Sequence, residues 1–293
     1  MTDAATEADL RRIADLYREA YANRDPSRAP IAASIRFSEN SVALPFPDGT
    51  WDSIAEELGP ALTLVDTVQG SIGIFTAIRT LDVTGFLAIR LRVAGGEIVE
   101  AEHVFSTPRN LSGPPTPIGP VEGFHHDPDL DQRVAEDEQM DRATLISIAD
   151  GYFATLENNN GEIRGTAFAE DCVRFENGKA YAEVEKLFRL GRYRFNERVR
   201  DRDYVVVDEA RGLVMARGFI DHKGILDEYA LTDGTMLKSI FREPHSWHLL
   251  ELFKIKAGKI TAVEATFIAV PYYMETPWAP ARRWDADNHL TRS

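Results

Sequence analysis

The stretch His245-Ser246-Trp247-His248 places two histidines three positions apart at the start of an expected strand. Imidazole has a pKa near 6.5, so it can accept and return protons at neutral pH. Asp221 and His222 end the preceding strand pattern, so all these groups could meet near one rim of a sheet, where Asp221 could orient a histidine. Two other interpretations stay open. His248 could be hydrogen-bonded in a core, and His222 could lie at the rim without a role.

Further polar side chains precede this stretch. Arg174 and Glu176 project to one side of an earlier strand pattern, and an arginine or a tyrosine hydroxyl can stabilise a developing oxyanion. The catalytic candidates are His222, His248, Asp221, Tyr152, Glu176 and Arg174. The candidates for substrate binding are His245, Phe175, Phe219, Trp247, Glu157 and Phe267. Core packing explains the aromatic residues equally well, an exposed pair explains Arg174 with Glu176, and a helix end explains Glu157.

Motifs for bound groups are missing from the sequence. There is no GxGxxG after a strand, no GxxxxGK and no HExxH. His125-His126 near Asp127 and Asp129 could ligate a metal, but a solvated loop explains this polar segment better. His245 and His248 could hold one metal ion only if their strand bent. We therefore expect neither a metal nor an organic cofactor.

The composition and charge of the chain limit its possible partners and location. The 293 residues are 44% hydrophobic, enough for two cores, and the net charge is -14 with a pI near 5.0. Nucleic acids and anionic membranes need basic patches, so neither is an expected partner. No apolar run of about 18 residues could cross a bilayer. The first residues lack the apolar stretch of a secretory signal, and Cys172 is the single cysteine, so we expect a cytoplasmic protein. A homo-oligomer is a separate expectation.

The longest strand-like pattern runs from Met236 to Tyr273. It predicts a long, curved antiparallel hairpin with arms at about 241–255 and 259–270, closed by Lys256-Ala257-Gly258-Lys259. Side chains alternate across a strand, which gives the first arm two faces: Ser246, His248, Leu250 and Leu252, and Trp247, Leu249, Glu251 and Phe253. The face with His248 could be the wall of a pocket.

The order of elements repeats along the chain. The first copy is expected to have helices at 8–23 and 51–58 and strands at 34–40, 72–81, 85–93 and 98–105. In the second copy, 148–152 repeats 13–17, 174–177 repeats 36–40 with one residue removed, and the final hairpins match around Glu102 and Glu264. Three matches in the same order indicate duplication of one domain.

The expected boundaries are domain 1 at 1–106, a Pro-rich and acidic linker at 107–141, domain 2 at 142–275 and a tail at 276–293. Helices followed by a curved, mostly antiparallel sheet make each copy α+β. The first copy offers mainly Tyr17, Tyr21, Glu39 and His103 among largely apolar strands. We therefore expect the working pocket in domain 2, with domain 1 as a support or a dimerising half.

The second copy, in residues 145–160, the segment 167–178 with its phrase FAEDCVRFENG, and the closing hairpin, resembles the nuclear transport factor 2-like, or SnoaL-like, superfamily. This resemblance, which extends to both copies, implies two cones, each a bent sheet wrapped around helices with a pocket inside. Active members usually work without a metal or an organic cofactor. Glu157 stands where the similar scytalone dehydratase family has an acidic residue near a helix end.

The resemblance and the candidate residues together suggest a cofactor-free lyase. It would act on a small hydrophobic aromatic alcohol by dehydration, or by C–C cleavage like that of the related lyases that release formaldehyde from lignin-derived diaryl diols. The alternatives are an isomerase or cyclase of the same fold, and a non-catalytic module for ligand binding or dimerisation.

Overall fold

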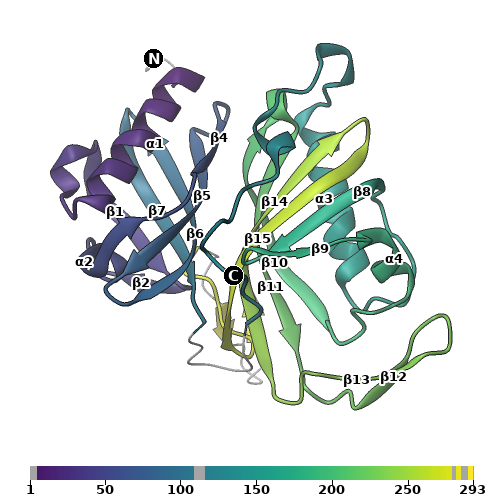
Figure 1. The fold of residues 1–293 in the computed structure, drawn as a ribbon. Helices are drawn as coiled ribbons and strands as arrows, with labels where there is room; N and C mark the ends of the chain where they lie inside the picture. Colours follow the sequence, from purple (N-terminus) through teal and green to yellow (C-terminus); the bar gives the residue numbers. More distant parts are fainter. Residues whose placement is uncertain (1–4, 109–115, 279–281, 285–289, 293) are drawn as a thin grey trace.

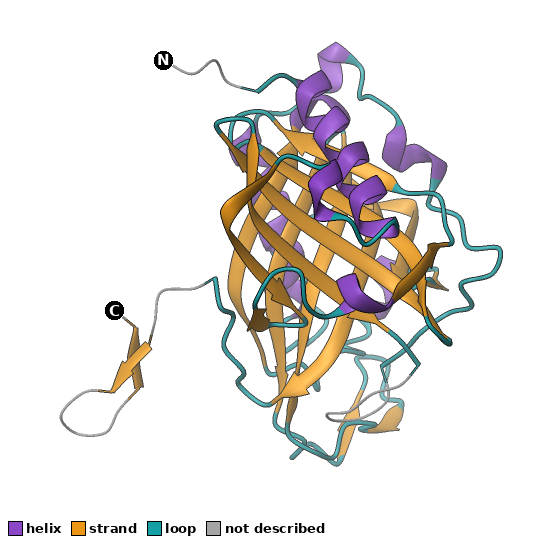
Figure 2. Ribbon diagram, turned by 90° about the vertical axis from the view of Figure 1, so that its left-hand side faces the viewer, coloured by secondary structure: helices purple, strands orange, loops and turns teal. Residues whose placement is uncertain are grey.

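The computed structural model describes residues 5–108, 116–278, 282–284 and 290–292. The chain is α+β, with a few helices and most strands in two open, curved sheets (Figures 1 and 2). Within these residues no helix is both long enough and apolar enough to cross a membrane.

The N-terminal half begins with an amphipathic helix that has a capping box. The Thr6 side chain accepts from the Asp9 amide, and the Asp9 carboxylate accepts from the Thr6 amide, which satisfies donors that a helix start leaves free. The elements of this half are α1 (Glu7–Ala22), a 3-10 turn (Pro26–Arg28), β1 (Ile31–Glu39), β2 (Val42–Leu44), α2 (Thr50–Ser53), β3 (Ile54–Glu57), β4 (Leu62–Asp66), β5 (Ser71–Thr80), β6 (Val83–Ala94) and β7 (Glu97–Ser106).

The C-terminal half follows two 3-10 turns, Pro128–Asp131 and Glu136–Glu138. Its elements are α3 (Arg142–Leu156), β8 (Phe168–Glu176), β9 (Lys179–Tyr181), α4 (Val184–Arg189), β10 (Arg198–Asp208), a 3-10 turn (Glu209–Arg211), β11 (Leu213–His222), β12 (Glu228–Ala230), β13 (Met236–Lys238), β14 (His245–Lys256) and β15 (Lys259–Pro271). A separate pair, β16 (Arg282–Trp284) and β17 (Leu290–Arg292), lies in the tail.

The two sheets have the same strand order. The first runs β2-β1-β7-β6-β5-β3, with β4 also paired to β5, and the second runs β9-β8-β15-β14-β11-β10. In each sheet the first long strand pairs in parallel with the last. Asn40 and Asn177 end these first strands with positive φ, and each side-chain oxygen accepts from a backbone amide of the last strand, that of Phe105 or Phe267. The repeated Asn therefore makes the same turn in both halves.

The two sheets pack against each other, with α1 on the outer side of one and α3 on the outer side of the other (Figure 1). An apolar layer joins them, and its members are Leu62, Leu64, Phe75, Ala88, Val104, Leu130, Val205, Val206, Leu213, Met215, Leu250, Leu252 and Ala262. Buried charges cross the same layer. Glu102 of β7 accepts from Arg90 at 3.0 Å and from Arg217 of β11 at 2.8 Å. Both faces of β11 and β14 are consequently buried.

The predicted hairpin forms, with a turn in which both Ala257 and Gly258 have positive φ, as a tight hairpin turn requires. Its first arm begins at His245 and not near 241, because Phe241 belongs to the segment that packs over the sheet. The helix expected at 51–58 is wrong beyond Ser53. Residues 54–57 form the edge strand β3, which pairs with β5.

The connection between the halves packs against both of them. Asp129 accepts from Lys256, and Lys254 donates to the carbonyl of Gln132. In the tail, the indole of Trp278 donates to Ser38 at 2.9 Å and lies under the guanidinium of Arg90. Parts of the predicted linker and tail, residues 109–115, 279–281, 285–289 and 293, lie outside the described residues.

Candidate functional site

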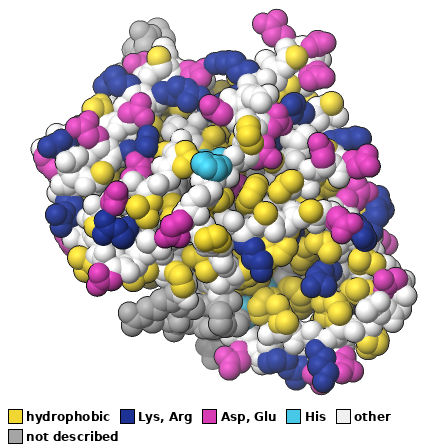
Figure 3. Space-filling view, viewed as in Figure 1, with side chains coloured by type: hydrophobic (Ala, Val, Ile, Leu, Met, Phe, Trp, Pro, Cys, Tyr) yellow, Lys and Arg dark blue, Asp and Glu magenta, His cyan; other side chains and the backbone are white. Residues whose placement is uncertain are grey.

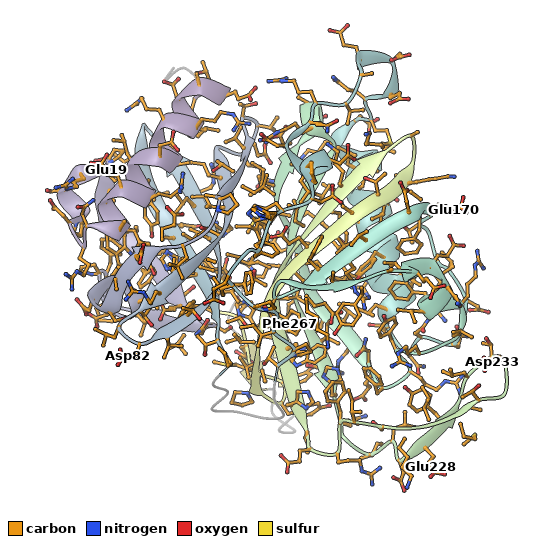
Figure 4. The ribbon with its side chains drawn as sticks, in the orientation of Figure 1. Glu19, Asp82, Glu170, Glu228, Asp233 and Phe267 are labelled. Carbon is orange, nitrogen blue, oxygen red and sulfur yellow. The ribbon has the colours of Figure 1, made fainter. Side chains whose placement is uncertain are left out.

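A cavity of about 530 Å³ lies in the C-terminal half, on the face of the sheet that turns away from the N-terminal half. Its volume is in the range of small-molecule sites. Side chains of α3, β8, β9, β11, β14 and β15 line it, together with the loop 190–196 and the β12–β13 hairpin. Figure 3 shows an apolar hollow here, bordered by Lys and Arg side chains, in the region that Figure 1 labels with α4 and β13. Phe267, one of its walls, is labelled in Figure 4.

One end of the cavity is polar. Arg174, on β8, is buried and forms an ion pair with Glu176 at 2.9 Å. Its guanidinium also donates to the hydroxyl of Tyr193 at 2.5 Å and lies 3.4 Å from that of Tyr152 on α3. The two tyrosines and the carboxylate therefore surround one fixed cation. Burial raises the pKa of both tyrosines, so they are hydrogen-bond donors at neutral pH.

Glu251 completes this polar end from the middle of β14. Burial raises the pKa of its carboxyl to about 8, although the positive charge of Arg174 and a hydrogen bond with Tyr152 act in the opposite direction. Glu251 is consequently protonated at neutral pH. A neutral carboxylic acid in an apolar site can donate a hydrogen bond or a proton, which an ionised carboxylate cannot.

The opposite wall is aromatic and has two histidines behind it. Trp247 and Phe267 line the cavity with ring centroids 4.9 Å apart. Asn196 also lines it, and its side-chain oxygen lies 2.8 Å from Nε2 of His222, which must donate. Nδ1 of His222 is left as a buried acceptor without a protein partner within the described residues. His245 stacks on His222 at 4.4 Å.

Burial lowers the pKa of both histidines, and each is therefore neutral at pH 7. His245 turns Nδ1 to the carbonyl of Glu243 at 2.8 Å, which leaves its Nε2 as an acceptor. His222 and His245 pack against Trp247 behind the aromatic wall, and neither lines the cavity itself.

The β12–β13 hairpin covers the outer side of the cavity. Tyr229 and Leu237 line the cavity from this hairpin, and the Tyr229 hydroxyl donates to the carbonyl of Arg192 at 2.8 Å. Ile240, which follows the hairpin, lines the cavity and is nevertheless 73% exposed. The hairpin and the loop around Arg192 therefore form the mouth.

The predicted catalytic residues divide between two faces of the sheet. Tyr152, Arg174 and Glu176 come together in the cavity, and so do Trp247 and Phe267 of the predicted binding residues. The expected meeting of Asp221, His222, His245 and His248 at one rim does not occur. Adjacent residues of a strand point to opposite faces, so His222 and His245 lie on the cavity side of the sheet and Asp221 and His248 on the other side.

His248 faces the N-terminal half. Its ring stacks on Phe219 at 4.9 Å, and its Nε2 is 3.6 Å from Glu102. Asp221 accepts from Arg200 and from Ser246 within the same buried layer. Phe219 also lies under the guanidinium of Arg200. The side of the first arm that was expected to form a pocket wall therefore contributes to the contact between sheets.

Two further predicted residues have structural positions. Phe175 points away from the cavity and packs on Phe124 of the connection. Glu157, at the end of α3, accepts from the Val199 amide at 2.7 Å and pairs with Arg202. Phe175 therefore packs the connection between the halves against β8, and Glu157 attaches the end of α3 to β10.

Within the described part of the chain, no group of three or more His, Cys, Asp or Glu side chains is arranged to hold a metal ion. His126 instead contacts Glu264 at 2.9 Å and the Pro60 carbonyl at 2.8 Å. The positions of His245 and His248 on opposite faces also exclude a shared ion.

In the N-terminal half, apolar residues occupy the positions that correspond to the polar end of the C-terminal cavity. By strand register, Phe37 occupies the place of Arg174, and Ile89 that of Glu251. His103 bonds to Tyr17 at 2.9 Å within packed aromatic rings. An apolar pair has replaced the two groups that form the polar end of the C-terminal cavity.

Two important residues escaped the sequence analysis. Glu251 was placed on the correct face with Trp247, but the significance of a carboxyl group between the apolar Leu249 and Phe253 on that face was missed. Tyr193 lies in a loop that follows a short helix, and no periodic pattern marks it.

Comparisons with known proteins match parts of this chain to a family model and to solved structures. Residues 138–267, which contain α3 and most of the cavity's sheet, match a family model described as a domain of unknown function, DUF8021. No curated protein matches the chain. Two solved structures are similar to parts of it. One is a de novo designed protein with a curved β-sheet, at 9% identity and a TM-score of 0.28, covering 35% of this chain and 88% of the other. The second is AclR, a presumed hydroxylase from Streptomyces galilaeus, at 17% identity and a TM-score of 0.30, covering 46% and 83%.

Proposed function

We propose that the C-terminal cavity is the active site of a cofactor-independent lyase, which removes water or an aldehyde from a small hydrophobic aromatic alcohol. We also propose that each half is a nuclear transport factor 2-like cone that arose by duplication, since the two sheets share one strand order and one Asn-terminated turn.

The observation that carries the proposed activity is the buried carboxyl group of Glu251 at the polar end of an apolar cavity, where burial raises its pKa to about 8. Elimination of a hydroxyl group requires an acid for the leaving oxygen and a base for the departing proton. Glu251 is suited to be the acid because burial keeps its proton at neutral pH. Glu176 is the carboxylate available as the base, and its ion pair with Arg174 holds it in place.

Glu176 takes a proton from the carbon next to the carbinol, the C–H electrons form a double bond, and the C–O bond breaks as Glu251 protonates the hydroxyl, which leaves as water. Glu176 then returns its proton to solvent and Glu251 takes one up. Tyr152 and Tyr193 donate hydrogen bonds to negative charge that develops on the substrate.

The test is turnover without any added cofactor. Purified protein is incubated with a panel of aryl-substituted alcohols, and the products are followed by conjugated absorbance and by mass. Loss of the mass of water or of an aldehyde supports the lyase. A product of unchanged mass would indicate an isomerase, and binding without turnover a non-catalytic module.

Glu251→Gln is the decisive variant, because the amide has nearly the same shape and no charge but cannot deliver the proton. It should lower kcat by about 100-fold or more. Glu228→Gln, an exposed carboxylate on the hairpin, is the matched control and should retain activity. Full activity of Glu251→Gln would refute the assigned role.

A further inference from the structure

The charge balance at the cavity differs from that of the whole chain. The chain has a net charge of -14, yet the cavity lining contains Arg174, Arg192 and Lys238 against two carboxyl groups. Glu176 is paired with Arg174, and Glu251 is protonated at neutral pH because burial raises its pKa to about 8. The remaining cations stand at the mouth.

Arg192, which lines the cavity, and Arg194, two residues further along the same loop, lack acidic partners in the described part of the chain. Within the described residues neither Arg192 nor Arg194 makes an ion pair, whereas Arg189, at the end of α4, pairs with Glu185 at 2.6 Å. Both unpaired arginines are close enough to Tyr229, in the cavity wall, for their charges to lower the pKa of its hydroxyl, against the larger effect of burial. Lys238 lies 3.8 Å from Glu228, with both side chains largely exposed. Arg192 is therefore an uncompensated positive charge in the cavity lining, and Arg194, two residues further along the same loop, adds a second charge nearby.

The loop that carries Arg192 also connects the mouth to the polar end. Arg192 is exposed, while the next residue, Tyr193, turns inward and bonds to Arg174. A ligand that fills the cavity thus meets a donor group at its inner end, aromatic walls at Trp247 and Phe267, and the unpaired guanidinium group of Arg192 at its outer end. Guanidinium groups bind carboxylates through paired hydrogen bonds.

We propose that Arg192, with the charge of Arg194 beside it in the loop, binds the carboxylate of the substrate, so that the substrate class is an aromatic hydroxy acid with its ring in the cavity and its carboxylate at the mouth. This proposal rests on the proposed function for the hydroxyl group, but the carboxylate site can be measured by binding alone.

The experiment compares two probes with the same apolar body, 4-phenylbutanoate and 4-phenylbutanamide, by isothermal titration calorimetry on the full chain at pH 7. The wild-type protein should bind the acid about fivefold more tightly than the amide at low salt, which corresponds to about 1 kcal/mol. The preference should fall toward onefold in 0.5 M NaCl, because salt screens exposed charges.

The double variant Arg192→Gln, Arg194→Gln should lose the preference for the acid and retain its affinity for the amide. Arg189→Gln, which changes a paired arginine near the same loop, should keep the preference. Equal binding of acid and amide by the wild type, a preference that survives in the double variant, or no binding of either probe would overturn the proposal.

The two proposals fail separately. Selective binding of the acid without elimination from any hydroxy acid would remove the lyase and leave the carboxylate site. Elimination from neutral alcohols with no preference for the acid probe would support the lyase and remove the carboxylate site.

Discussion

The wild-type protein should become less stable as the pH rises toward 8, and Glu251→Gln should not show this decline. The carboxyl is buried, and burial raises its pKa from an ordinary value of 4.5 to about 8. An unfolded chain releases this proton near pH 4.5, but the folded protein keeps it until about pH 8. Between these two values the folded state binds more protons, so the stabilising effect of protonation declines with increasing pH.

The magnitude follows from the same two values. Each pH unit in this window lowers the free energy of unfolding by about 1.4 kcal/mol. From pH 5.5 to the folded pKa near 8, the wild type should therefore lose about 3 kcal/mol that Glu251→Gln does not lose. The full window would amount to about 5 kcal/mol, which is a large part of the stability of an ordinary domain.

Urea unfolding at pH 5.5, 7 and 8.5 measures this difference, with Glu228→Gln as a control for the loss of an exposed carboxylate. The free energy of unfolding of Glu251→Gln should rise relative to the wild type at each step, while that of the control should follow the wild type. Parallel pH profiles for the wild type and Glu251→Gln would refute the reasoning, since they would mean that Glu251 is ionised or hydrated in the cavity.

Three more outcomes are expected. Arg174→Met should move the decline in stability to higher pH, because the charge of Arg174 lowers the pKa of Glu251, and the same urea series would detect this; an unchanged profile would contradict it. His222→Gln should resist acid better than the wild type at pH 5, as burial lowers the pKa of His222 and its protonation below about pH 6.5 favours unfolding; thermal unfolding at pH 5 and 7.5 would check this. Glu102→Gln should cost about 3 kcal/mol or more, because it leaves two arginines without their shared buried carboxylate, and a urea midpoint equal to that of Glu97→Gln, the loss of an exposed carboxylate on the same strand, would argue against it.

Local pattern was sufficient for much of the fold. The strand predicted to end at Asp221 and His222 does end there, and the hairpin turn at Ala257-Gly258 is where the turn residues place it. The edge strand β3 could not be recognised because its residues, Ile54–Glu57, continue a helix-like pattern and become a strand only by pairing with β5.

The sequence by itself determined which side chains share a face of β14, because alternation is a property of one strand: Trp247 with Glu251, and His248 with Leu250. It could not determine which face lines a cavity, since both faces are buried and both look apolar. Only the packing of the N-terminal sheet against one side decided that His248 contacts Glu102 and that Glu251 remains in the hollow. The chemistry of the site follows from that choice, because burial beside Arg174 and Tyr152 sets the protonation of Glu251.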